Sequence, residues 1–317
     1  MNKKQPLMAV VGPTASGKTA LGIALAKEYN GEVISADSMQ IYKGMDITTA
    51  KPIENEMDGV PHHLISILEM NAEFSVADYV KLAKEKINDT VSRGKLPILV
   101  GGTGLYVSSL IDNINFDNAV TDGKIRERLT SESIAVGNAG MLEKLKAVDP
   151  ETAQILPANN IIRIIRALEI YEITGIPFSK YKEQSRRESE YNCCMIGLTY
   201  TDRQQLYEKI NKRVDIMLQN GMLEECNAIY NNNILGTACQ AIGYKEFIPY
   251  FKGERSLDEC IDKIKQSSRR YAKRQLTWFR RDERIKGIEL TDVIPFDKII
   301  EESKKIVAKS NILCYNS

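Results

Sequence analysis

The chain has 317 residues, of which 43% are hydrophobic and 27% are charged, the composition of a globular protein with a substantial core. Its net charge is +1, so the molecule is not a polycation and any nucleic-acid surface must be a local patch. No apolar stretch approaches the roughly 20 residues that span a bilayer, and we expect no membrane partner. Six cysteines without a C-x-x-C pair, and only two histidines, disfavour a zinc site and favour a reduced, cytoplasmic setting.

The first elements along the chain predict a phosphate site. The apolar run Leu7–Val11 predicts a strand, and residues 20–26 predict a helix. The segment between them has the P-loop spacing G-x-x-x-x-G-K-[ST], and it reads Gly12-Pro13-Thr14-Ala15-Ser16-Gly17-Lys18-Thr19. Its backbone N–H groups and the helix N-terminus would hold a di- or triphosphate, with Lys18 on the phosphates and Thr19 holding Mg²⁺. An ordinary glycine-rich turn is the alternative, which the full spacing disfavours.

The next elements predict a parallel sheet. Gly31–Ser38 reads as a strand ending in a polar turn, and residues 75–91 as a helix with Ser75 as its N-cap. Leu96–Val100 is an apolar strand that leads into Gly101–Gly104. This alternation is typical of an α/β fold with right-handed crossovers. Ligands of such sheets bind at the carboxyl ends of the strands, so the P-loop, Asp37-Ser38 and Gly101–Gly104 should surround one crevice.

The composition changes from about residue 117 to residue 191, where charged helical patterns replace strands. The predicted helices of this part are Lys124–Leu129, Met141–Ala147 and Asn160–Ile173. The later elements are a strand at Met195–Thr199 and helices at Arg203–Asn220 and Ser256–Arg281. We therefore predict a P-loop NTPase-like α/β core at 1–117 and 195–317, interrupted by a mostly helical insertion domain at 118–194.

Two polar residues of the crevice have open roles. Asp37 is a candidate general base, Mg²⁺ partner or helix N-cap, and its place in the crevice favours the catalytic role over the cap. Thr103 follows two glycines, so ligand contact and a plain tight turn are about equally supported. The strand before it ends in glycine, where many P-loop NTPases have a Mg²⁺-binding acid. This weakens the ATPase and kinase interpretations.

The predicted helix at Ser256–Arg281 contains eight basic residues and no acid from residue 263 onward. They are Lys263, Lys265, Arg269, Arg270, Lys273, Arg274, Arg280 and Arg281. A solvated face is the ordinary interpretation, but phosphate contact with aromatic stacking on Tyr271 and Trp278 would explain the lack of counter-charges. Arg163 and Arg166 could extend the patch. Arg213 is either a phosphate clamp or an exposed solubilising residue.

Taken together, the motifs resemble those of the tRNA dimethylallyltransferases, also called tRNA isopentenyltransferases, of the bacterial type. The matching segments are GPTASGKT at 12–19, ISADSMQIYKGMDITTAKP at 34–52, PHHL at 61–64, VGGTGLY at 100–106, RALEIYEITG at 166–175, QAIGYKE at 240–246 and YAKRQLTWFR at 271–280. They span nearly the whole chain in order. Two departures are Ser66, where an Asp is common, and Ile161-Ile162, where more polar residues often occur.

The resemblance implies transfer of a dimethylallyl group from dimethylallyl diphosphate to the exocyclic amine of the adenosine 3′ of the anticodon. Asp37 would accept a proton and Thr103 would hydrogen-bond the base. Lys18, Arg213 and a Mg²⁺ on Thr19 would stabilise charge on the leaving diphosphate, which residues 12–19 bind. The residues implied in binding the tRNA anticodon stem-loop are Asp37, Ser38, Met39, Gln40, Thr103, Arg126, Ile161, Ile162, Arg163, Ile164, Ile165, Arg166, Arg270, Lys273 and Arg274. The last three are expected to contact tRNA phosphates and not the diphosphate. We expect a monomer.

Three rival functions remain. An adenylate isopentenyltransferase, which prenylates free nucleotide, would need neither the basic helix nor the insertion. A P-loop small-molecule kinase would transfer phosphate from ATP without tRNA. A non-enzymatic RNA-binding module would leave the P-loop unexplained.

Overall fold

The computed structural model describes residues 4–116, 121–232, 234, 236–291 and 293–313. The chain divides into two compact units, a core unit of Met1–Ile111 with Glu190–Ser317 and an insertion unit of Asp112–Ser189. The insertion is predicted at residues 118–194, and the observed unit begins and ends several residues earlier. No helix among the described residues has both the length and the hydropathy needed to cross a bilayer.

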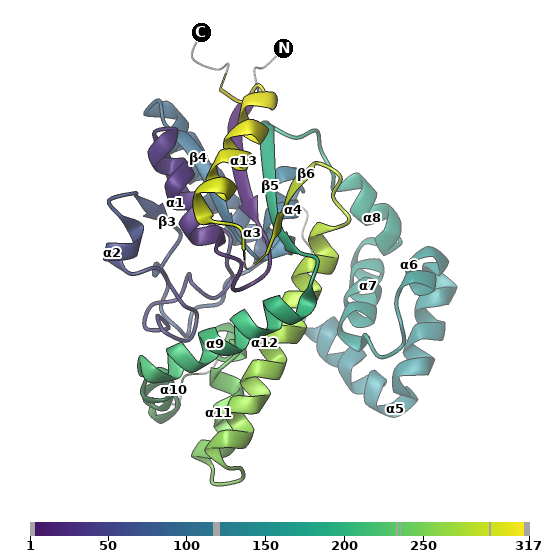
Figure 1. The fold of residues 1–317 in the computed structure, drawn as a ribbon. Coiled ribbons are helices and arrows are strands. Elements are labelled where there is room, and N and C mark those ends of the chain that lie inside the picture. The colour runs from purple at the N-terminus through teal and green to yellow at the C-terminus, as the bar shows by residue number, and fades with distance from the viewer. Residues whose placement is uncertain (1–3, 117–120, 233, 235, 292, 314–317) are drawn as a thin grey trace. The chain divides into compact units, whose positions relative to one another are not determined.

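The core unit is built on a six-stranded sheet in which every pair of neighbouring strands is parallel (Figure 1). The strands are β1 Gln5–Val11, β2 Gly31–Ser35, β3 His62–His63, β4 Leu96–Gly101, β5 Tyr191–Tyr200 and β6 Ile285–Leu290, in the order β3-β2-β4-β1-β5-β6. The predicted α/β class with a P-loop NTPase-like parallel sheet is confirmed. The strand predicted at Met195–Thr199 begins at Tyr191, because β1 pairs with it from Gln5 onward.

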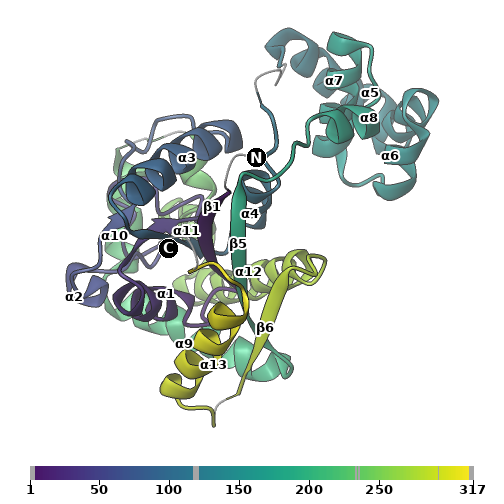
Figure 2. The same cartoon turned by 90° about the horizontal axis from the view of Figure 1, so that it is seen from above.

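Helices cover both faces of this sheet (Figure 2). Those on one face are α1 Lys18–Glu28 and α13 Phe296–Lys309, and those on the other are α3 Val76–Ser92 and α4 Gly104–Ile111. Beyond the carboxyl edge of the strands lie α9 Arg203–Gln219, α10 Met222–Asn231, the 3₁₀ turn η1 Thr237–Gln240, α11 Tyr244–Phe251 and α12 Leu257–Phe279 (Figure 1). A short helix, α2, spans Glu54–Met57. The helices beyond the edge place side chains over the crevice that the topology predicts.

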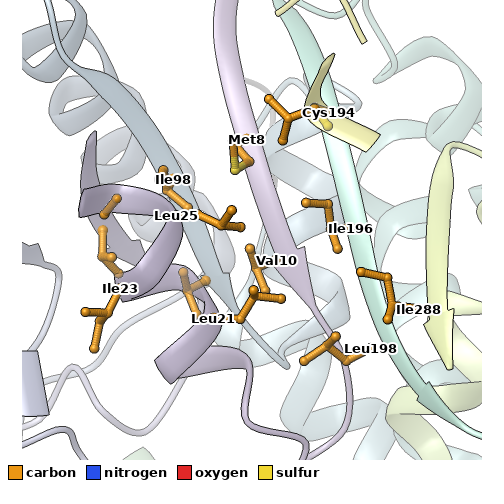
Figure 3. Packing of buried hydrophobic residues seen from close by; sticks show 14 of the residues in the cluster. Met8, Val10, Leu21, Ile23, Leu25, Ile98, Cys194, Ile196, Leu198 and Ile288 are labelled. Atoms are coloured by element: carbon orange, nitrogen blue, oxygen red, sulfur yellow. The ribbon is translucent and has the colours of Figure 1, made fainter. Parts of the chain in front are cut away.

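The hydrophobic core lies between α1 and the central strands. Leu21 and Leu25 of α1 are fully buried against side chains of β1, β4 and β5, such as Val10, Ile98 and Ile196 (Figure 3). The inner strand β1 is buried on both of its faces from Leu7 to Val11, as parallel strands between two helix layers usually are. This packing fixes the P-loop, which joins β1 to α1.

The insertion unit is helical, as predicted. Its helices are α5 Gly123–Val148, α6 Pro150–Ile155, α7 Ile161–Thr174 and α8 Phe178–Gln184. The two helices predicted at 124–129 and 141–147 belong to α5, which breaks at Gly137, where φ is +72°. Helix α7 ends at Gly175, which is in the left-handed conformation that commonly terminates helices. The core of the unit includes Leu129, Met141 and Leu168.

Candidate active site

A cavity of about 250 Å³ lies at the carboxyl edge of the sheet. The three segments that the topology predicted to meet all contribute to its wall, through Lys18 and Thr19, through Asp37 and Ser38, and through Gly101. The remaining wall comes largely from α9, from α12, from residues 240–245 and from residues 39–52. The crevice predicted from strand order is therefore present in the core unit.

The P-loop adopts the conformation that an anion requires. Ala15 and Gly17 have φ values of +62° and +80°, and such left-handed residues turn successive N–H groups into one concavity. The N–H groups of residues 15–17 donate to no residue that the structure describes. The buried Ser16 Oγ also finds no partner within the described chain. These donors converge at the N-terminus of α1, where the helix dipole favours negative charge.

Two cations face this loop. Lys18 Nζ donates a hydrogen bond to the Pro13 carbonyl oxygen at 3.2 Å, and Arg213 Nη1 donates one to Thr14 Oγ1 at 3.1 Å. Burial and, to a smaller extent, the charge of Arg213 lower the pKa of Lys18, Asp37 raises it, and together these effects bring the pKa to about 8. Arg213 therefore faces the P-loop, and the alternative of an exposed solubilising residue is wrong. An anion bound between these cations would stabilise the charge of both.

Asp37 caps a turn with one carboxylate oxygen and leaves the other available. Its Oδ1 accepts hydrogen bonds from the N–H groups of Met39 at 2.9 Å and Gln40 at 3.3 Å. Its Oδ2 accepts none from the described residues, and Asp37 lines the cavity. The residues after Asp37 form a turn and not a helix, so Oδ1 caps this turn instead of a helix N-terminus, while Oδ2 can still accept a proton.

Thr103 supports the turn that carries Asp37. Its Oγ1 accepts a hydrogen bond from the Ser38 N–H at 3.1 Å, and its own N–H donates to the Ala36 carbonyl oxygen at 3.1 Å. Ser38, Met39 and Gln40 line the cavity, whereas Thr103 itself stands just behind it. A contact between Thr103 and the substrate base stays a prediction.

Part of the cavity wall is apolar. Ile210, Arg213, Val214 and Met217 occupy one face of α9, with the spacing of three and four residues that aligns side chains on a helix. Met217 lies one turn beyond Arg213, about 6 Å along the helix axis at 1.5 Å per residue. Other apolar lining residues are Met222, Ile242 and Ile264. The cavity thus offers an anion site and, one helical turn away, a hydrocarbon site.

Most of the basic run lies on α12, and its residues there have different environments. Lys265 forms an ion pair with Asp215 at 2.6 Å, and Arg269 hydrogen-bonds Asn211 Oδ1 at 2.5 Å, so both are tied to α9. By contrast, Arg270 and Lys273 are exposed and have no ion pair with any described residue.

Arg274 differs from both groups. It is exposed, its guanidinium lies 5.4 Å from the centre of the Tyr271 ring, and it lines the cavity. The sequence predicts that Arg270, Lys273 and Arg274 lie away from the diphosphate. Arg270 and Lys273 do not line the cavity, but Arg274 does, so Arg274 is not separated from the proposed diphosphate site as the prediction requires.

Sequence analysis missed Gln275, which lies on the buried face of α12. Its side-chain oxygen accepts a hydrogen bond from the Thr14 N–H at 2.8 Å, and its side-chain nitrogen donates to the Gly102 carbonyl oxygen at 3.0 Å. A polar residue on the buried side of an amphipathic helix was the available signal.

In the insertion unit, the predicted RNA-binding residues separate by exposure. Ile162 is 80% exposed and Arg163 is exposed, but Ile164 and Ile165 are buried in the core of the unit. Packed neighbours cover the side chains of Ile164 and Ile165, and the contact of these residues with RNA stays a prediction. Ile161 is half-buried.

Two of the predicted RNA-binding arginines neutralise a buried acid. Arg126 and Arg166 each approach Glu169 Oε2 at 2.8 Å, and Glu169 is 0% exposed. Burial alone would raise the pKa of Glu169, but the hydrogen bonds from Arg166 and Arg126 outweigh it and lower the pKa. Part of their charge is thus compensated within the unit.

The donors at the cavity fit a Mg²⁺ held mainly by phosphate. The described residues contain no group of three or more His, Cys, Asp or Glu side chains suited to a metal. Mg²⁺ on a bound phosphate needs only one or two protein ligands, and Thr19 and Asp37 both line the cavity. His62 and His63 have structural partners instead, the Val60 carbonyl oxygen and Glu32.

Comparison with known proteins gives consistent matches over nearly the whole chain. The family model described as IPP transferase matches residues 40–282. The chain is 50% identical over 309 residues to the tRNA dimethylallyltransferase of Thermoanaerobacter sp. (strain X514), covering 96% of each protein. It is 48% identical over 297 residues to that of Bacillus subtilis (strain 168), covering 93% of this chain and 94% of the relative.

Solved structures agree with the sequence matches. The full-length tRNA isopentenylpyrophosphate transferase from Bacillus halodurans is similar with a TM-score of 0.74 and 46% identity, over 97% of both chains. A eukaryotic dimethylallyltransferase acting on tRNA is similar with a TM-score of 0.80 and 28% identity, over 99% of this chain and 80% of that one.

Proposed function

The chain belongs to the IPP transferase family, and we propose that it transfers the dimethylallyl group of dimethylallyl diphosphate to tRNA. The acceptor is the exocyclic amine of the adenosine 3′ of the anticodon, and the products are isopentenyladenosine and diphosphate. One observation supports this most strongly. A P-loop faced by Lys18 and Arg213 opens onto an apolar wall one helical turn away, beside a carboxylate oxygen that accepts no hydrogen bond from the described chain.

The P-loop holds the leaving group in this mechanism. As the allylic C–O bond breaks, negative charge grows on the diphosphate. The N–H groups of residues 15–17, Lys18 and Arg213 are in place before that charge develops, so they stabilise it without reorganisation. The five-carbon group lies against Val214 and Met217. A Mg²⁺ held by Thr19 and the phosphates would supply further positive charge there.

Asp37 acts as the proton acceptor. The exocyclic amine of adenine is a weak nucleophile, because its lone pair is delocalised into the ring. Its protons become acidic once the C–N bond begins to form, and Oδ2 of Asp37 can then accept one. The hydrogen bonds from Met39 and Gln40 hold the carboxylate in place through its other oxygen.

The exposed side of α12 suits an RNA acceptor better than a free nucleotide. Arg270 and Lys273 form no ion pair with a described acid, so they are available for backbone phosphates. The adenine must leave the stack of the anticodon loop to reach Asp37, as in other enzymes that modify bases. We place the enzyme in the cytoplasm as a monomer, and the five free cysteines among the described residues fit a reducing compartment.

The decisive experiment uses labelled dimethylallyl diphosphate with unmodified tRNA, with AMP or without an acceptor. Label should enter tRNA, require no ATP and stop when Mg²⁺ is chelated. Labelling of AMP but not of tRNA would instead identify an adenylate isopentenyltransferase. Phosphate transfer from ATP to a small acceptor would identify a kinase.

A further inference from the structure

The Gln275 side chain joins three segments that are far apart in the sequence. It is 4% exposed and belongs to α12. Its oxygen accepts from the Thr14 N–H of the P-loop, and its nitrogen donates to the Gly102 carbonyl oxygen in the turn after β4. Both ends of the amide are therefore used, one as an acceptor and one as a donor.

The packing around this amide is tight. A Cβ on Gly102 would lie 2.1 Å from Gln275 Nε2, so only glycine at 102 admits the amide. Trp278, nearly one turn further along α12, lies over Gly104, where an added Cβ would come within 2.4 Å of the indole ring. The same face of α12 thus contacts the glycine turn at two points.

Thr14 is consequently held from two sides. Gln275 takes its N–H, and Arg213 donates to its hydroxyl oxygen. The backbone on either side is unusual, with φ of +157° at Gly12 and +62° at Ala15. Such residues persist only where the surrounding structure constrains them. Because the Thr14 N–H is used by Gln275, it is the neighbouring N–H groups that remain for phosphate.

We propose that Gln275 is a positioning residue of the transfer reaction. It fixes the P-loop and the glycine turn on one helix, and that turn carries Thr103, which in turn holds the Ser38 N–H beside Asp37. Gln275 lines the cavity, but both ends of its amide are bonded to Thr14 and Gly102, so it acts by setting the separation between the diphosphate and the proton acceptor. This inference rests on the function proposed above.

The chemistry of the bridge requires a side chain that accepts and donates at once. Methionine at 275 would fill similar space with neither bond. An ionised glutamate would still accept from Thr14 but would place a carboxylate oxygen against the Gly102 carbonyl oxygen. A protonated glutamate would regain the donor, so a Gln275→Glu enzyme should recover as the pH falls. A purely structural role in packing would not produce that recovery.

The test compares Gln275→Met and Gln275→Glu with a Gln266→Met control on the same helix. Gln266 accepts a hydrogen bond from Lys263 at the surface, away from the P-loop. We expect Gln275→Met to raise the Kd for dimethylallyl diphosphate, measured calorimetrically without RNA, by roughly tenfold or more, the scale expected when two hydrogen bonds are removed. The kcat of transfer should also fall in Gln275→Met, whereas its Kd for tRNA should match that of wild type. The Gln266→Met control should match wild type in all three measurements.

The Gln275→Glu enzyme supplies the second measurement and the safeguard if the methionine variant does not fold. Position 275 is buried, and burial raises the pKa of a carboxyl group. The ratio of the KM of this variant for dimethylallyl diphosphate to that of wild type should therefore fall toward one between about pH 8 and pH 5.5, as the carboxyl takes up a proton. A pH-independent defect, or a lower melting temperature with unchanged Kd and kcat, would overturn the positioning role. A wild-type protein that binds no dimethylallyl diphosphate would instead overturn the proposed function itself.

Discussion

Removing Arg270 and Lys273 together tests whether α12 contacts RNA phosphates. Both side chains are exposed, neither lines the cavity, and neither pairs with an acid among the described residues. Removing one side chain that contacts a phosphate should reduce the slope of log K against log salt by roughly 0.7 to 0.9. For Arg270→Ala/Lys273→Ala the slope should therefore fall by about 1.4 to 1.8.

This slope change has a measurable consequence. Between about 50 and 200 mM salt, a fourfold change, wild type should lose about 7- to 12-fold more affinity for the tRNA than the double variant does. The assay is tRNA binding across a salt series, with a thermal melt and dimethylallyl diphosphate binding beside it. The last two should match wild type, because these side chains lie apart from the cavity.

The chain offers a control with the same change of charge. Lys265→Ala/Arg269→Ala also removes two positive charges from α12, but these side chains are tied to Asp215 and Asn211 of α9. This control should lower the melting temperature and leave the salt slope unchanged. Equal slopes for wild type and Arg270→Ala/Lys273→Ala, or equal slope changes in both double variants, would refute specific phosphate contact.

Four further predictions concern single residues, three of the cavity and one of the insertion unit. Asp37→Asn should lower kcat by roughly 10²- to 10⁴-fold with unchanged tRNA affinity, and near-normal kcat in a transfer assay would remove Asp37 as the base. Because the pKa of Lys18 is about 8, the affinity for inorganic diphosphate should fall as the pH rises above 8, and a calorimetric pH series of Lys18→Ala should lack that decline. Met217→Ala should raise the relative kcat/KM for a ten-carbon allylic diphosphate by roughly tenfold, whereas no gain would exclude Met217 from the hydrocarbon site. Glu169→Gln should destabilise the protein by about 2 kcal/mol at pH 7, since it removes the charge that pairs with Arg126 and Arg166, which are themselves partly exposed. Because the pKa of Glu169 is lowered by folding, that difference in melting should shrink as the pH falls below the ordinary pKa of the carboxyl, and a constant difference would contradict it.

The elements that could be predicted are those with local signals. Helix α3 begins where Ser75 and Asp78 form a capping box, and residues 96–100 form an unbroken apolar strand. Helix α4 was missed, because it follows a glycine turn without a side-chain cap. The edge strand β6 was also missed, since Lys286 and Gly287 interrupt its apolar pattern.

Some features of the site can likewise be predicted from local signals, and others cannot. The P-loop and the role of strand ends can be read from short motifs and topology. The environment of Arg213 could not, because its partner Thr14 lies 199 residues earlier in the chain. Gln275 and Thr14 are 261 residues apart, and no local pattern reports which helix face closes over a loop. The exposure of Ile164 and Ile165 likewise depends on the packing of α5 against α7.

The end of β4 explains why this P-loop serves carbon chemistry in our proposal. Many P-loop NTPases place a Mg²⁺-binding acid at the end of a neighbouring strand. Here that position is Gly101, and a Cβ on it would lie 2.2 Å from the Ala36 carbonyl oxygen, so no acidic side chain fits. The acid that lines the cavity is instead Asp37, whose Oδ1 is committed to the turn. With a single carboxylate oxygen left beside Lys18 and Arg213, the site suits a departing diphosphate and one accepted proton better than the acid-coordinated metal of a kinase.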